Sequence, residues 1–375
     1  MQVLWVHGSP GSGKSTTCWA VREQLTGLRH GYVDIDQLGM CYPARADDPD
    51  REVLQARVLG GVVATFAAAG AELVVVSGCL APRLLPLYEE VVGDAELHLC
   101  LLSADPDELR RRILERGCDE DEVRRVQAEA AELEAGADPA DTRQVVLHPG
   151  AADPRQVARL VLERTGVLTA PRGPATAAPP VAVPSDAPGR VLWLCGPKAV
   201  GKSVAGWALF QALLGSGVTA GFADLAQLGF FSDPPADDPQ DHRLRAANLA
   251  ALWSCFAGAG ASHLVLAGAV DTREDVERYR RALPAAEVTV VRLRAGADDL
   301  AGRVASRGRG GGPEIAGEDL AGRSAEVLQR ALAAALADQE RLDAAAVEDV
   351  CVDTGGLGAE ETAQRVLAAC GDLRP

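Results

Sequence analysis

Short runs of apolar residues alternate along the chain with longer segments whose apolar positions recur at helical spacing. Periodicity alone does not separate such short runs from buried helix, but their order after glycine-rich loops favours strands. Strands that alternate with helices are typical of βαβ units, in which helices cover both faces of a parallel sheet. The predicted strands are Val3–His7, Gly31–Ile35, Leu73–Val76, Glu96–Leu102, Val145–Leu147, Val191–Cys195, Ala220–Ala223, His263–Ala267, Val288–Leu293 and Val350–Val352.

The whole pattern occurs twice. Lys14 recurs as Lys202, 188 residues later, and DIDQLG at 34–39 recurs as DLAQLG at 224–229, an offset of 190. The motif L-x-x-R-x-x-x-R-G, which starts at Leu109, reappears at an offset of 191. A register that drifts this little over such a length indicates duplication of an entire domain.

The repeat and the length of 375 residues predict an α/β protein with two tandem domains. We expect the domains at 1–165 and 190–375, each a parallel sheet with helices on both faces. Residues 166–189 between them are rich in proline and alanine, which is typical of an extended linker.

Each half opens with an apolar strand that runs into G-x-x-x-x-G-K-[ST]. Glycines at this spacing let successive N–H groups point at phosphates, the lysine reaches the β- and γ-phosphates, and the serine hydroxyl binds Mg²⁺. The sequence therefore predicts two sites for ATP and Mg²⁺. The predicted nucleotide-binding residues are Gly8, Gly11, Ser12, Gly13, Lys14, Ser15 and Thr16 in the first loop, and Gly196, Val200, Gly201, Lys202, Ser203 and Val204 in the second.

Composition narrows the class of protein. A formal net charge of −16 argues against broad contact with a nucleic acid polymer. The longest apolar stretch contains a glutamate and several glycines, so we expect no membrane span. The nine cysteines show no spacing typical of a metal site, and the N-terminus shows no signal peptide, which together predict a cytoplasmic protein with reduced thiols. Oligomeric state stays open.

The sequence lacks the motifs that define two large classes of P-loop protein. A GTPase reads guanine with N-K-x-D, but the single asparagine of the chain is Asn248, in ANLA. Motor and transport ATPases usually carry a carboxylate at the end of a central strand, whereas the corresponding strands end in VVVSGC and LVLAGA.

An acidic motif follows the second strand, in YVDIDQLG, and arginines lie on a predicted helix in LRRRILERG. With GSPGSGKST, these motifs make residues 1–165 resemble small-molecule kinases of the shikimate kinase and gluconate kinase type, and more loosely chloramphenicol phosphotransferase. Together with the repeat, the resemblance implies an α/β fold of two tandem P-loop kinase-like domains. The glycine triplet and acid-binding arginine motif of true shikimate kinases are absent from the sequence, so the resemblance does not imply shikimate as substrate.

The resemblance implies roles for individual residues. Asp34 and Ser15 would hold Mg²⁺, Lys14 would neutralise the phosphates, and Asp36 would contact the acceptor hydroxyl. Arg112 and Arg116, one helical turn apart, would stabilise the transferred charge. Plain alternatives exist, since aspartates often form turns and caps, and the arginines have acidic neighbours for surface ion pairs. The charged segment 119–136 is either a lid or a solvated helix.

The second half keeps Ser203 and Asp224 as candidate Mg²⁺ ligands, but Ala226 occupies the position of Asp36. Either this half binds ATP without transferring phosphate, or another group replaces the carboxylate; candidates are Asp237, Asp238 and His242. In the related kinases the loop before the final helix packs against adenine, and the region with Asp47, Asp48, Arg51 and Arg57 would line the acceptor pocket.

The resulting hypothesis is an ATP-dependent kinase that phosphorylates a small metabolite, antibiotic or nucleotide, with Lys14, Asp36, Arg112 and Arg116 as catalytic residues. The N-terminal domain would be catalytic and the C-terminal domain would bind nucleotide. The alternative is a regulatory or scaffolding protein that binds ATP and transfers phosphate slowly or not at all.

Overall fold

The computed structural model describes residues 1–375 except 138–139, 151, 170–182, 312–319 and 372–375. The chain forms two compact units, which are not its two contiguous halves. Unit 1 consists of Met1–Gly39, Glu52–Val181 and Gly229–Leu244, and unit 2 of Met40–Arg51, Ala182–Leu228 and Arg245–Pro375. Each half therefore contributes one short segment to the unit built mainly by the other half. Most of the predicted linker lies outside the described residues.

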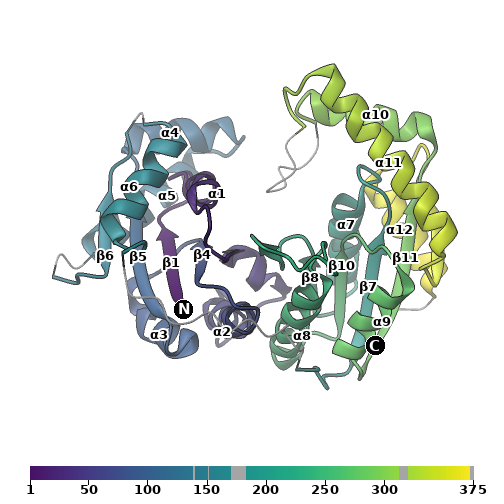
Figure 1. Cartoon of the computed structure of the whole chain (residues 1–375), viewed down its shortest axis with the longest axis horizontal. Coiled ribbons are helices and arrows are strands. Elements are labelled where there is room, and N and C mark those ends of the chain that lie inside the picture. The colour runs from purple at the N-terminus through teal and green to yellow at the C-terminus, as the bar shows by residue number, and fades with distance from the viewer. Residues whose placement is uncertain (138–139, 151, 170–182, 312–319, 372–375) are drawn as a thin grey trace. The chain divides into compact units, whose positions relative to one another are not determined.

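Unit 1 contains a six-stranded sheet in the order β6-β5-β1-β4-β2-β9. Figure 1 labels its strands β6, β5, β1 and β4. All neighbours are parallel except β9, which runs antiparallel to β2. The strands are β1 Gln2–His7, β2 His30–Asp34, β4 Leu73–Ser77, β5 Glu96–Leu102, β6 Gln144–Leu147 and β9 Phe230–Phe231. The helices are α1 Lys14–Gln24, η1 Ile35–Gly39, α2 Glu52–Ala68, η2 Pro82–Leu84, α3 Leu85–Val92, α4 Pro106–Glu115, α5 Glu120–Ala135 and α6 Pro154–Thr165.

Unit 2 repeats this arrangement with the strand order β12-β11-β7-β10-β8-β3, in which β3 is antiparallel to β8. The strands are β3 Cys41–Tyr42, β7 Gly189–Cys195, β8 Ala220–Asp224, β10 His263–Ala267, β11 Ala286–Arg294 and β12 Val350–Asp353. The helices are α7 Lys202–Gly215, α9 Arg273–Ala282, α10 Ala297–Gly308, α11 Ala325–Ala345 and α12 Ala359–Cys370. Helix α8, His242–Gly258, begins in unit 1 and continues into unit 2.

Both faces of each sheet are covered, as the all-apolar strands predict. In β1, Leu4 and Val6 belong to the same core cluster as residues of α1 and α6. Trp5 points to the other face, where its ring lies 4.5 Å from that of Tyr88 in α3. The predicted fold class is thus confirmed, and all ten predicted strands are present with boundaries shifted by at most two residues.

The sequence pattern missed the exchanged strands β3 and β9. Phe230 and Phe231 of β9 pair with Tyr32 and Gly31 of β2, and Phe230 packs on the core of unit 1. The reciprocal pair in unit 2 joins Cys41 to Gly221. Strands of two residues carry no detectable period, and their partners lie about 190 positions away along the chain.

Candidate active sites

The first P-loop connects β1 to α1 with the backbone geometry expected for a phosphate cradle. Gly8, Gly11 and Gly13 have φ values of 147°, 82° and 95°, a region that side chains other than glycine rarely adopt. A Cβ on Gly8 would lie 2.3 Å from the carbonyl oxygen of Leu102. A side chain at position 8 would therefore collide with the backbone of β5, so the structure itself requires glycine there.

Lys14 begins α1 and its Nζ donates to the carbonyl oxygen of Ser9, 2.9 Å away, inside the loop. Burial lowers the pKa of Lys14, while the negative charge of Asp36 acts against that shift more strongly than any other charged group. Asp36 is therefore the acid whose field Lys14 feels most. The P-loop lysine and the predicted acceptor carboxylate thus share one site.

Asp34 and Asp36 lie where β2 passes into η1. The backbone N–H of Asp36 donates to Oδ1 of Asp34 at 3.1 Å, so Asp34 forms the strand-end turn that was the plain alternative for this motif. Burial and then the neighbouring Asp36 raise the pKa of Asp34 to about 6, which a turn residue on the surface would not show. The turn and the charged environment exist together, so the turn does not exclude a functional role.

The raised pKa predicts that Asp34 lowers the free energy of unfolding at neutral pH. The ordinary pKa is 3.8, so the unfolded chain loses this proton before the folded chain does, and stability falls as the pH rises from about 4 to about 6. Asp34→Asn should raise the free energy of unfolding at pH 7 without Mg²⁺, by at most about 3 kcal/mol. Thermal unfolding at pH 7 and pH 4 checks this, with the exposed Asp94→Asn as control. An equal effect of Asp34→Asn at both pH values would contradict it.

Arg112 of α4 contacts the first P-loop directly. Its Nη1 donates to the carbonyl oxygen of Gly11 at 2.8 Å, and its Nε pairs with Glu108 at the same distance. Arg112 therefore lies at the phosphate loop and also forms the ion pair with an acidic neighbour that was the alternative. Arg116 differs: α4 ends at Glu115, and the exposed side chain of Arg116 forms no hydrogen bond or ion pair within the described part of the chain. Only Arg112 is held at the phosphate loop.

Helix α5 was predicted to be either a lid or a solvated helix. It packs over the carboxyl ends of β4 and β5, where its glutamates contact Cys79 and Ser103. Its Val123 and Val126 form a buried cluster with Ile113 of α4. On the same helix, Glu129 accepts from the Cys79 thiol at 3.2 Å, and its charge acts on Lys14. Sequence reasoning missed Glu129, because nothing in the charged run 119–136 distinguishes the one acid that reaches the lysine.

The second P-loop repeats the first. Gly196 and Gly201 have φ values of 140° and 100°, and Lys202 Nζ donates to the carbonyl oxygens of Gly196 and Pro197. Ser203 Oγ donates to Asp224 Oδ2 at 2.7 Å. A hydroxyl and a carboxylate this close fit Mg²⁺, which typically takes one or two carboxylates and completes its coordination with phosphate oxygens and water.

Ala226 of unit 2 occupies the structural position of Asp36. Its N–H donates to Asp224 Oδ1 at 2.9 Å, which reproduces the turn formed by Asp34 and Asp36 in unit 1. The backbone is therefore the same in both units, while the second carboxylate is present in unit 1 alone.

A cavity of about 200 Å³ adjoins the second P-loop. Its walls include Val200, Val204 and Arg303, together with Leu357 and Gly358 from the loop before the final helix. Arg303 is the counterpart of Arg112, and its Nη1 donates to the carbonyl oxygen of Val200 at 2.7 Å. The loop that the resemblance assigned to adenine thus lies beside the phosphate loop of unit 2.

The segments expected to complete the acceptor pockets are exchanged between the units. Asp47, Asp48 and Arg51 fall within Met40–Arg51 of unit 2, whereas Arg57 lies in α2 of unit 1. The exchange had no signal in the sequence.

The exchange also bears on the residues that could replace the missing carboxylate of the second half. Asp237, Asp238 and His242 belong to unit 1, not to the unit that holds the second P-loop. Asp238 Oδ1 accepts from the backbone N–H of His242 at 2.9 Å, and Asp237 pairs with Arg243. Within the described residues, Asp237 and Asp238 therefore bind groups at the start of α8.

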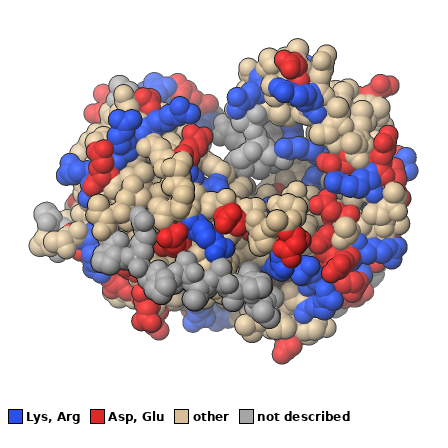
Figure 2. All heavy atoms as spheres, in the orientation of Figure 1, with Lys and Arg blue, Asp and Glu red and all other residues tan. Residues whose placement is uncertain are grey.

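Figure 2 shows Lys and Arg interspersed with Asp and Glu over the face in view. Within the described ranges, no helix combines the length and apolar character that crossing a membrane requires.

Residues 5–133 match the model of a protein family described as AAA domain. The match contains the first P-loop, the D-x-D motif and the arginines of α4, which are the motifs that carry the resemblance described above. A search of curated proteins found none similar to this chain.

Solved structures similar to this chain include three proteins of about half its length. A sugar kinase from Janibacter sp. HTCC2649 is 20% identical, with 44% of this chain and 95% of that chain covered and a TM-score of 0.34. The tunicamycin resistance protein of Deinococcus radiodurans is 19% identical (48% and 94% covered, TM-score 0.31), and a gluconokinase from Sinorhizobium meliloti 1021 is 20% identical (44% and 93% covered, TM-score 0.32). Similarity at this level carries no conclusion on the activity of this chain.

Proposed function

We propose that the chain is a Mg²⁺-dependent kinase that transfers the γ-phosphoryl group of ATP to a hydroxyl or phosphate of a small metabolite, antibiotic or nucleotide. The observation that carries the proposal is the convergence of Lys14, Asp36 and Arg112 on the first P-loop of unit 1. Phosphoryl transfer depends mainly on in-line positioning and neutralisation of charge, which this set of groups provides.

The transfer step assigns one task to each residue. The acceptor oxygen attacks the γ-phosphorus, the bond to the β–γ bridging oxygen breaks, and Asp36 accepts the proton of the acceptor hydroxyl. Lys14 neutralises the β- and γ-phosphates, and Arg112, with Arg116 if α4 shifts toward the loop, offsets the charge that develops. Ser15 and Asp34 would hold Mg²⁺, which supplies further positive charge at the phosphates.

Unit 2 is proposed as a nucleotide-binding unit that does not transfer phosphate. Lys202, Ser203 and Asp224 support binding of Mg²⁺ and phosphates, and the cavity beside Val204 and Leu357 suits part of the base or ribose. Ala226 leaves this unit without the group that receives the acceptor proton.

Calorimetric titration of ATP·Mg²⁺ into wild type, Lys14→Ala and Lys202→Ala tests both assignments, with a phosphate-transfer screen against pooled sugars, antibiotics and nucleotides on the same samples. We expect two binding sites in wild type, one in each variant, and transfer that only Lys14→Ala abolishes. Two sites without transfer to any pool would favour the regulatory alternative. Loss of transfer only in Lys202→Ala would reverse the roles of the units.

A further inference from the structure

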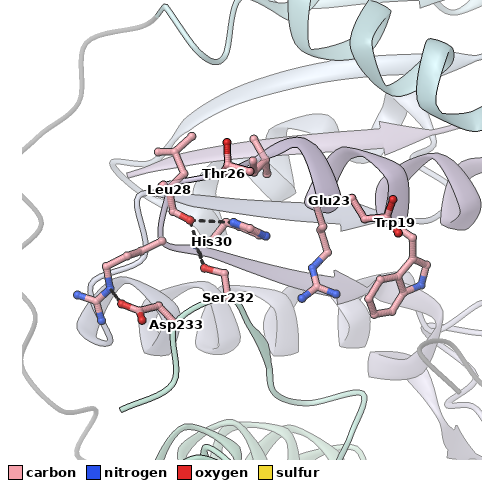
Figure 3. A pocket seen from close by; sticks show the side chains of 11 residues that line it. Trp19, Glu23, Thr26, Leu28, His30, Ser232 and Asp233 are labelled. Carbon is pink, nitrogen blue, oxygen red and sulfur yellow. Dashed lines mark hydrogen bonds and ion pairs between the residues drawn. The ribbon is translucent and has the colours of Figure 1, made fainter. Parts of the chain in front are cut away.

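Unit 1 contains a cavity of about 710 Å³ at the His30 end of β2, away from the P-loop (Figure 3). β2 has five residues, so this end lies roughly 13 Å from the Asp34 end that holds the candidate active site. Both halves of the chain line the cavity, because Ser232 and Asp233 follow the exchanged strand β9. The cavity is therefore a second concave site within the same unit.

Arg22 is the unusual group in this wall. Its guanidinium carbon lies 4.4 Å from the centre of the Trp19 ring and 5.4 Å from that of Phe230. Its Nε is buried without a hydrogen-bond partner, and no carboxylate of the described residues pairs with it. Stacking on aromatic rings attracts the cation but accepts none of its five N–H donors in the plane of the group. A half-buried arginine in this state lacks an acceptor.

The other charges of the cavity are already paired. Asp233 lies 3.4 Å from Arg29, and Glu23 lies 3.5 Å from Arg155. The C-terminal end of α1 supplies about half a negative charge near Arg22, which offsets its charge only in part. Arg22 is therefore the charged group of the cavity wall without an ion pair among the described residues, while the two carboxylates oppose a ligand of high negative charge.

His30 supplies an acceptor. Its Nδ1 lies 2.9 Å from the carbonyl oxygen of Leu28, so Nδ1 carries the hydrogen, and Ser232 Oγ donates to the same oxygen at 3.2 Å (Figure 3). Burial lowers the pKa of His30, so the ring is neutral at pH 7. Nε2 is then an acceptor, and it forms no hydrogen bond with any residue in the described ranges.

The repeated positions in unit 2 carry different side chains. Phe210 stands 188 residues after Arg22, and Tyr42 of exchanged strand β3 stands 190 before Ser232. The rings of Phe210 and Tyr42 lie 6.1 Å apart, and that of Trp207 lies 5.2 Å from Phe210. The Arg51 guanidinium carbon lies 4.1 Å from the centre of the Tyr42 ring, so three aromatic rings and one stacked arginine hold the exchanged strand of unit 2. Arg22 and Ser232 of unit 1 therefore stand where unit 2 has two packed aromatic rings, and in unit 1 these two residues line a cavity.

We propose that this cavity binds a small organic anion that also carries a hydroxyl group. A carboxylate or the phosphate of a monoester accepts from the Arg22 guanidinium, and the hydroxyl donates to Nε2 of His30. The site is independent of both P-loops. A ligand bound here also contacts the segment that follows β9, so it stabilises the exchange.

Thermal unfolding of the full chain with Lys14→Ala and Lys202→Ala, which weakens phosphate binding at the P-loops, tests the proposal. The probes are ribose 5-phosphate, gluconate and inorganic phosphate. We expect ribose 5-phosphate or gluconate to raise the unfolding temperature, and which of the two does so identifies the acidic group. Arg22→Phe, which copies unit 2, should weaken binding by about tenfold to a hundredfold. Ser232→Tyr, which fills the cavity, should weaken it as well.

The exposed Arg159→Ala removes one positive charge elsewhere and should leave the shift unchanged. If Arg22→Phe does not fold, Ser232→Tyr decides alone. The proposal is overturned if neither organic anion shifts the unfolding temperature, if inorganic phosphate alone does so, or if the shift survives Ser232→Tyr. None of these outcomes depends on phosphate transfer, so the kinase proposal can fail or hold separately.

Discussion

Asp36→Ala should lower the rate of phosphate transfer by about 10²–10⁴-fold and leave the affinity for ATP·Mg²⁺ nearly unchanged. Loss of a positioned general base typically has an effect of this size. The affinity should persist because Asp36 lies beyond the phosphate loop, and Lys14 is held by the carbonyl oxygen of Ser9 rather than by Asp36. Single-turnover transfer and calorimetric titration measure the two quantities separately.

Unit 2 provides the structural control for this substitution. Ala226 forms the same backbone hydrogen bond to Asp224 that Asp36 forms to Asp34. Alanine is therefore compatible with the turn, and Asp36→Ala removes the carboxylate without removing the backbone arrangement. A drop in turnover would then report chemistry rather than misfolding.

The matched variant is Asp48→Ala, which removes an acid from the segment that follows η1 in sequence but lies in unit 2. It should keep full transfer activity. If Asp48→Ala and Asp36→Ala reduced turnover equally, the segment Met40–Arg51 would contribute to the acceptor site of Asp36, and unit 1 alone would not form that site. Retained turnover in Asp36→Ala would remove Asp36 from the mechanism and favour Glu129, whose charge also acts on Lys14.

The features that could be predicted from the sequence are those determined by residues close together along the chain. The P-loops, the strands and the turn at Asp34 each depend on neighbours a few residues away, so spacing and residue type determine them. The contact of Arg112 with Gly11 joins positions 101 residues apart, and only the resemblance suggested that Arg112 acts near the phosphates. Arg116 shows the limit of helical spacing, since the helix ends one residue earlier.

The missed features depend on packing between distant segments. Glu129 is one of several acids in its helix, and only the fold brings it to Cys79. The exchange of β3 and β9 is invisible to pattern analysis, because a duplicated sequence has two equivalent partners for every strand. Pairing within a half and pairing across the halves bury the same kinds of side chain, so the repeat predicts both equally well.

A chain cleaved at a protease site inserted within residues 166–189 should remain a single particle. Each unit contains a strand from both fragments: β9 pairs with β2 in unit 1, and β3 pairs with β8 in unit 2. Separation would leave both sheets with an unpaired edge and would expose the aromatic residues that cover Tyr32 and Phe210. Size-exclusion chromatography of the cleaved protein measures this directly.

The fragment 1–189 produced alone should be less stable than unit 1 in the intact chain, by roughly 3 kcal/mol for the two half-buried phenylalanines of β9. Addition of fragment 190–375 should restore the stability, because it returns β9 to β2 and receives β3 in exchange. Fragment 190–375 with Phe230→Asp and Phe231→Asp is the matched control, since it offers the same chain with charges that unit 1 cannot bury. If both cleaved fragments separated at low protein concentration and each unfolded at the temperature of the intact chain, every half would pair its own strands and the exchange would be absent in solution.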